Sequence, residues 1–171
     1  LWSVLRLSED EVLKGSLLIT LYENLRWKTI SPQGFRDEML AYLPNESNSL
    51  LFSMALSYLG DCQRIFPSDS RPLEQALWKI VTTNPVSQHR LQAFRLYRSI
   101  ADSEEAVQRL YTLWQERKAP KDCALSESDY IGLSYILAIH LPEKADKIIA
   151  TQLSRIQNPD RKKEYQFISP S

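Results

Sequence analysis

Hydrophobic residues recur at intervals of three and four along most of the chain, the period of a helix that buries one face. Leu17, Leu21 and Leu25 lie on the first such stripe. Ser8 and Glu11 precede it at the spacing of a capping box, in which each side chain satisfies an N–H group of the first turn. The pattern therefore predicts a helix that begins near Ser8 and ends near Leu25.

Proline separates the hydrophobic segments from one another and predicts where helices end and begin. Further helices are expected over about 31–43, 47–66, 70–81, 85–101, 102–114, 126–139 and 142–156, with another starting near Pro159. The segment from Tyr130 to Ile139 is apolar almost throughout, which favours a central position for its helix. Ser126-x-x-Asp129 and Asp102-x-x-Glu105 are further predicted starts.

About eight or nine helices joined by short turns, with no convincing strand, predict an all-α fold. Helices of this length in this number are typical of stacked antiparallel pairs, an α-α superhelix of the HEAT or armadillo kind. No consensus sequence recurs from pair to pair, so the expected repeat is structural. We expect one helical-repeat domain over residues 1–171.

The last predicted helix is cut short. Asn158 can cap it, Pro159 suits its first position, and Asp160 places a negative charge in its first turn. The chain stops about ten residues later, leaving Tyr165 and the Phe167–Ile168 pair on an apolar surface that nothing downstream covers. We therefore expect the chain to be a fragment of a longer protein.

Composition excludes some classes of partner. Lys+Arg and Asp+Glu are balanced at 21 each, so no overall field attracts nucleic acid or an anionic membrane surface. No apolar run approaches the ~20 residues of a membrane-spanning helix. We expect neither a nucleic-acid partner nor a membrane segment.

The sequence also lacks a recognisable catalytic group. A catalytic zinc needs three protein ligands, and the only two histidines, His89 and His140, fall in different predicted helices. We expect His89 to be solvated near a helix start and His140 to be a structural residue at a helix end. No nucleophile elbow or phosphate-binding glycine loop is present either. We expect no catalytic residue, no metal ligand and no cofactor in this chain.

Several short segments, in this order and spacing, resemble the C-terminal helical domain of zinc metallopeptidases of the aminopeptidase N family. They are Val12-Leu-Lys-Gly-Ser-Leu-Leu-Ile-Thr-Leu-Tyr-Glu-Asn24, Leu110-Tyr-x-Leu-Trp114, Lys118-Ala-Pro120, Leu125-Ser-Glu-Ser-Asp-Tyr130, Gln152-Leu-Ser-Arg-Ile-Gln-Asn-Pro-Asp-Arg-Lys-Lys163 and Phe167-Ile-Ser-Pro170. The resemblance spans most of the chain, and its tail is the strongest part.

The resemblance implies a parent hydrolase, a zinc aminopeptidase that removes N-terminal residues from peptides. Its catalytic domain, with a His-Glu-x-x-His helix and a further Glu ligand, would precede this segment and hold the zinc. The segment itself would be a non-catalytic C-terminal domain that shapes and encloses the substrate cavity. The implied partners are the catalytic domain of the same polypeptide and the peptide substrate.

Arg95 and Arg98, interleaved with Phe94 and Tyr97, are the candidate binding residues. One of the two arginines could receive the C-terminal carboxylate of a peptide, for which a planar guanidinium is suited. The alternative is an ion pair on a solvated face, since Asp102 follows Arg98 by four residues.

A second hypothesis for the whole chain is a free-standing helical-repeat scaffold that binds a protein or peptide in its concave face. A start codon close to Leu1 would favour this scaffold, whereas an upstream zinc-binding motif would favour the aminopeptidase domain.

Overall fold

The structure is a computed structural model that describes residues 1–168. Those residues form ten α-helices and two short 3₁₀ helices, with no strand among them, so the predicted all-α class is confirmed. The chain divides into two compact units, one of residues Leu1–Ile100 and one from Ala101 onward, and each is described by itself. The expected single domain and the superhelix over the whole chain stay predictions.

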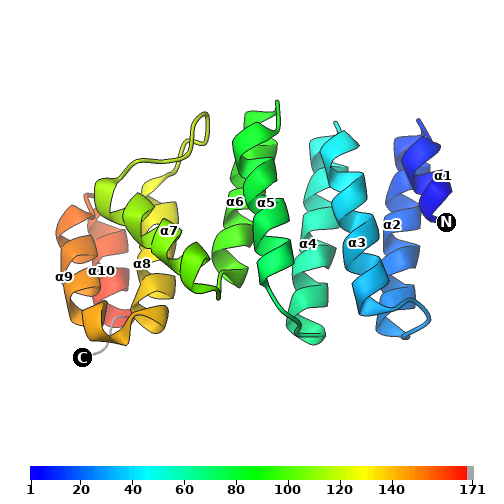
Figure 1. Cartoon of the computed structure of the whole chain (residues 1–171). Helices are drawn as coiled ribbons and strands as arrows, with labels where there is room; N and C mark the ends of the chain where they lie inside the picture. Colours follow the sequence, from blue (N-terminus) through cyan, green and yellow to red (C-terminus); the bar gives the residue numbers. More distant parts are fainter. Residues whose placement is uncertain (169–171) are drawn as a thin grey trace. The chain divides into compact units, whose positions relative to one another are not determined.

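The first unit contains six α-helices in two layers (Figure 1). They are α1 (Trp2–Leu7), α2 (Glu11–Arg26), α3 (Pro32–Tyr42), α4 (Ser49–Ile65), α5 (Arg71–Thr83) and α6 (Ser87–Ile100), with the 3₁₀ helix η1 (Leu43–Asn45) after α3. Helix α4 packs against both α2 and α6, while α3 packs on α4 and α5 packs on α6. Helix α1 is additional to the predicted set, because six residues are too few to display a helical period.

Large apolar side chains fill the space between the two layers. Phe52 and Leu59 of α4 are completely buried, as are Phe35 and Met39 of α3 and Leu21 of α2. Burying each such side chain contributes about 1.5–3 kcal/mol. The interior of this unit therefore follows the three- and four-residue stripes predicted from the sequence.

Local capping explains where several helices begin, and it corrects two predicted starts. Helix α2 is capped by Asp10, whose carboxylate accepts hydrogen bonds from the N–H groups of Val12 and Leu13, whereas Ser8 accepts one from Asp10. The capping box predicted at Ser8 is therefore wrong, because Asp10 lies closer to the apolar stripe and takes the cap. Ser103 likewise caps the helix that was predicted over 102–114, in place of Asp102.

The second unit contains α7 (Glu104–Glu116), α8 (Glu127–His140), α9 (Ala145–Arg155) and α10 (Pro159–Ile168), with the 3₁₀ helix η2 (Pro142–Lys144) before α9 (Figure 1). Helix α8 packs against both α7 and α9, which confirms its predicted central position within this unit. The capping box of Ser126 and Asp129 is confirmed, with both reciprocal hydrogen bonds present.

The tail forms the predicted helix, but one of its expected exposed residues is buried. Asn158 caps α10 by accepting hydrogen bonds from the N–H groups of Asp160 and Arg161, as predicted. Tyr165 is only 1 % exposed, because its hydroxyl is hydrogen-bonded to Ser134 of α8 at 2.8 Å and its ring stacks on Tyr135. The expectation that Tyr165 lies uncovered is therefore wrong, whereas Phe167 is 90 % exposed.

Candidate functional site

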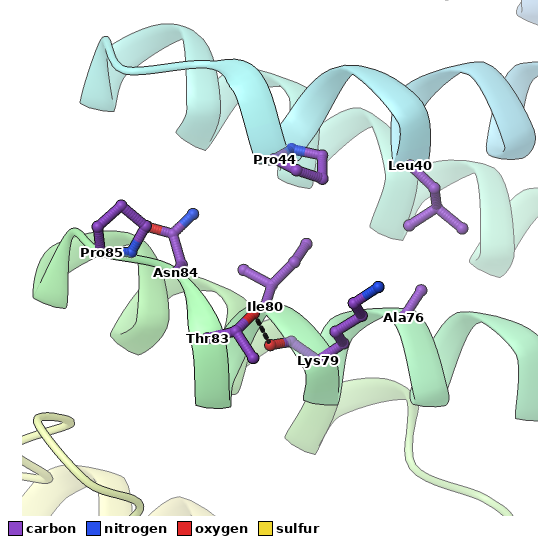
Figure 2. A pocket seen from close by; sticks show the side chains of 8 residues that line it. All are labelled: Leu40, Pro44, Ala76, Lys79, Ile80, Thr83, Asn84 and Pro85. Atoms are coloured by element: carbon purple, nitrogen blue, oxygen red, sulfur yellow. Dashed lines mark hydrogen bonds between the residues drawn. The ribbon is translucent and has the colours of Figure 1, made fainter.

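A groove of about 330 Å³ lies between α3 and α5 in the first unit. Figure 2 shows Leu40 and Pro44 on one side, facing Ala76 and Ile80 of α5 on the other. Lys79, Thr83, Asn84 and Pro85 complete the lining. Its walls are largely apolar, which is typical of surfaces that receive an apolar side chain of a ligand.

Two polar groups in the groove can orient a ligand. Asn84 ends α5, and its side-chain oxygen accepts a hydrogen bond from the N–H of Val86 at 2.9 Å, so its amide NH₂ is the available donor. Lys79 is exposed, and no carboxylate of residues 1–168 lies within salt-bridge distance of its ammonium group. Both groups donate hydrogen bonds, so the groove favours a ligand that offers oxygen acceptors beside an apolar group.

The predicted binding residues Arg95 and Arg98 lie on α6 and do not line this groove. Arg95 is exposed and Arg98 is half-buried. Both residues interact with other groups of the protein. Their role in receiving a peptide carboxylate stays a prediction.

A buried carboxylate connects three helices of the first unit. Glu46, whose side chain is 1 % exposed, forms an ion pair with Lys14 of α2 at 3.1 Å. It also accepts hydrogen bonds from the hydroxyl of Tyr42 and from the N–H of Asn48, which caps α4. Burial alone would raise the pKa of Glu46, but these three donors together hold it below its ordinary value. The cluster is internally neutralised, which favours a structural role over ligand binding.

His89 is completely buried, so the prediction that it is solvated is wrong. Its ring stacks on Phe52 of α4 at 4.0 Å between centroids, and its Nε2 is 3.0 Å from the hydroxyl of Ser49. Burial lowers its pKa, and Glu46 opposes this shift without reversing it. The packing of α6 on α4 places this histidine inside the unit, an effect that the polar sequence around it conceals.

The Ser49–His89 pair resembles a nucleophile and its base in distance alone. Such a base is normally held by a third group, but Nδ1 of His89 is buried without a hydrogen-bond partner among the described residues. The imidazole is also closed to any substrate, because none of its surface is exposed. We interpret the pair as a structural contact.

The described residues contain no cluster that could hold a metal ion. No group of three or more histidine, cysteine, aspartate or glutamate side chains meets the geometric requirement within residues 1–168. The two histidines lie in separate units, on α6 and at the end of α8. In the part of the chain that the structure describes, no helix has the length and apolar character needed to cross a membrane.

The sequence interpretation missed a cluster of cationic and aromatic side chains in the second unit. Arg155 of α9 lies over the ring of Trp114 at 4.8 Å and donates hydrogen bonds to the carbonyl oxygens of Trp114 and Gln115, at 3.0 and 3.2 Å. Arg117, which follows α7, lies over the ring of Tyr130 at 5.2 Å. We call Arg117, Tyr130 and Arg155 the arginine cluster. No local sequence pattern marks it, because packing of α7, α8 and α9 brings its members together.

Comparisons with protein-family models, with curated proteins and with solved structures give no match to this chain. The function of this chain is therefore inferred from its residues and their geometry, together with the sequence resemblance.

Proposed function

We propose that this chain is a non-catalytic helical domain of a zinc aminopeptidase that removes N-terminal residues from peptides. The observation that carries the proposal is the order and spacing of the aminopeptidase-like segments, above all the tail from Gln152 to Pro170. An all-helical chain is compatible with this role. The domain would shape and enclose the substrate cavity, while the catalytic domain of the same polypeptide would bind zinc and carry out hydrolysis.

The residues of this chain do not fit a catalytic zinc. His89 is buried against Phe52, and His140 lies in the other unit. Zinc catalysis requires three ligands around one ion and an open coordination position. The proposed zinc therefore belongs to the catalytic domain alone.

An activity assay tests whether this chain itself catalyses peptide hydrolysis. The chain of residues 1–171, supplied with zinc, should not hydrolyse aminoacyl p-nitroanilides above the rate of zinc alone. Hydrolysis that a chelator abolishes would contradict the proposal.

The coding sequence upstream of Leu1 tests the parent protein. We expect it to encode a His-Glu-x-x-His motif followed by a more distant Glu. A start codon directly before Leu1 would contradict the aminopeptidase assignment and favour the alternative scaffold.

Arg95 and Arg98 are the proposed contacts for the carboxylate end of the peptide substrate. In the full-length enzyme, replacing each arginine with alanine should raise KM for peptides long enough to reach this domain and leave KM for dipeptides unchanged. An unchanged KM at every peptide length would exclude this role.

The groove between α3 and α5 favours one alternative, a scaffold that binds a peptide segment. Its apolar walls suit an aliphatic side chain, and Lys79 and Asn84 can donate to backbone carbonyl oxygens of the peptide. Ala76→Glu would place a carboxylate in the groove, whereas Gln75→Glu changes a neighbouring exposed residue outside it. Peptide binding abolished by the first substitution and retained after the second would support the scaffold.

A further inference from the structure

The arginine cluster brings two guanidinium groups to the end of α7. Arg155 reaches this end from α9 and hydrogen-bonds the carbonyl oxygens of Trp114 and Gln115. Arg117 directly follows Glu116, the last residue of the helix, and its guanidinium lies over the ring of Tyr130. The pKa of Arg155 is lowered, chiefly by burial and in addition by repulsion from the charge of Arg117.

The positive charge of this cluster is not balanced by the described protein. Among residues 1–168, neither Arg117 nor Arg155 has a carboxylate within salt-bridge distance. The carbonyl groups at the end of a helix carry about half a negative charge, which offsets only part of two positive charges. Most of the positive charge of the two guanidinium groups therefore has no opposing charge in contact with it.

The cluster also contains hydrogen-bond donors that the described protein does not use. Arg117 is exposed, and its guanidinium donates to no acceptor among residues 1–168. Burial raises the pKa of Tyr130, so its hydroxyl is protonated at neutral pH, and it has no hydrogen-bond partner in the described part of the chain. Arg155 uses one N–H of each terminal nitrogen and retains further donors.

The backbone at Arg117 has an uncommon conformation for a non-glycine residue. Arg117 adopts the left-handed conformation with φ of 54° at the end of α7, a position where glycine is usually preferred. A non-glycine residue is unfavourable in this conformation. Lys28 and Asp122 adopt the same conformation, so the backbone alone does not select an arginine here; the contact with Tyr130 and a ligand that needs a guanidinium both favour one.

We propose that the arginine cluster is a binding site for a phosphate dianion, either free or as a monoester. Two guanidinium groups match the double charge of phosphate, and planar guanidinium forks bind its oxygens bidentately. The Tyr130 hydroxyl supplies a donor to a remaining oxygen. A carboxylate, with one negative charge, would leave part of the positive charge unbalanced.

The alternative interpretation is that Arg155 only caps α7 and that Arg117 is a hydrated surface residue. Capping by a basic side chain at a helix C-terminus is common and explains Arg155. It does not explain why a second guanidinium, with unused donors, lies beside the first. The two interpretations differ in whether phosphate binds and in what removal of Arg117 does.

A titration of the chain of residues 1–171 with inorganic phosphate tests the proposal. Sodium chloride holds the ionic strength constant, at about pH 7.5, where phosphate is mostly a dianion. We expect saturable shifts of the Arg117 and Arg155 side-chain N–H resonances in NMR spectra. Sulfate should bind comparably, and acetate more weakly. Absence of saturation, or acetate binding as tightly as phosphate, would overturn the proposal.

Variants separate binding from folding. Arg117→Gly removes the guanidinium at a position that suits glycine, so the chain should fold normally and bind phosphate at least about tenfold more weakly. Arg117→Lys should bind with intermediate affinity, and Arg64→Ala, which removes an exposed arginine of the first unit, should bind like the unsubstituted chain. Equal affinity of the Arg117→Gly and unsubstituted chains would overturn the assignment.

A phosphate monoester distinguishes the source of the ligand. If phosphoserine in a short peptide binds more tightly than inorganic phosphate, the site recognises a phosphorylated segment. If only inorganic phosphate binds, the site takes the free ion. Either result supports phosphate chemistry, and failure of both ligands to bind contradicts it.

Discussion

The two units treat their charged clusters in opposite ways. In the first unit, the Glu46 carboxylate has an ammonium group, a hydroxyl and a backbone N–H as partners, so its charge is neutralised inside the protein. In the second unit, Arg117 and Arg155 lie near each other with no carboxylate partner among the described residues. Removing one member of a satisfied buried cluster leaves the other groups uncompensated inside the protein, whereas an unbalanced cluster favours a ligand of opposite charge.

The largest expected effect comes from breaking the satisfied cluster. Glu46→Ala leaves Lys14 and the Tyr42 hydroxyl without their shared partner and removes the acceptor for the N–H of Asn48. We expect it to lower the free energy of unfolding by about 3 kcal/mol, measured by urea denaturation. Glu9→Ala, which removes an exposed carboxylate, is the matched control and should change stability by less than about 0.5 kcal/mol. Equal effects of the two substitutions would show that Glu46 is not structural.

The next-largest effect concerns Arg155, the member of the arginine cluster that caps α7. Arg155→Ala removes two hydrogen bonds to the end of α7 and the contact with Trp114, so we expect a loss of about 2 kcal/mol in the free energy of unfolding. Arg161→Ala, which removes an exposed ion pair with Glu127, should cost less than about 1 kcal/mol. A loss from Arg155→Ala no larger than that of its control would remove the capping role of this residue.

The pH dependence of stability tests the buried histidine of the first unit. Because burial lowers the pKa of His89 in the folded chain, the unfolded chain binds more protons once the pH falls below about 6.5. The contribution of neutral, buried His89 to the free energy of unfolding is complete above that pH. Below it, this contribution should decrease by up to about 1.4 kcal/mol per pH unit. Denaturation of His89→Gln should lack this decrease, while His140→Gln, which changes the half-buried histidine, should retain it. An identical pH dependence in all three chains would contradict the burial of His89.

The elements that depend on neighbouring residues were predictable from the sequence. The capping box of Ser126 and Asp129, the Asn158 cap and the apolar stripes all follow from residues a few positions apart. The start of α2 was predicted two residues early, since Ser8 and Asp10 are both capping residues and the sequence pattern does not decide between them. Helix α1 escaped prediction because it is only six residues long.

The parts that depend on tertiary packing were not predictable. His89 lies in a polar segment, yet α4 supplies Phe52 and Ser49 from forty residues earlier to cover it. Tyr165 is buried because its helix returns to α8. Between Arg117 and Arg155 the chain passes through α8, η2 and α9, which ends at Arg155, and no periodicity relates the two residues.

We propose that Arg117 serves phosphate binding and not stability. Urea denaturation of the Arg117→Gly chain, with and without phosphate, distinguishes these two roles. Without phosphate, we expect this variant to be as stable as the unsubstituted chain or up to about 1 kcal/mol more stable, because glycine relieves the left-handed backbone. We expect phosphate to stabilise the unsubstituted chain alone. A variant that is less stable by about 1 kcal/mol or more, or that gains as much stability from phosphate, would contradict the claim.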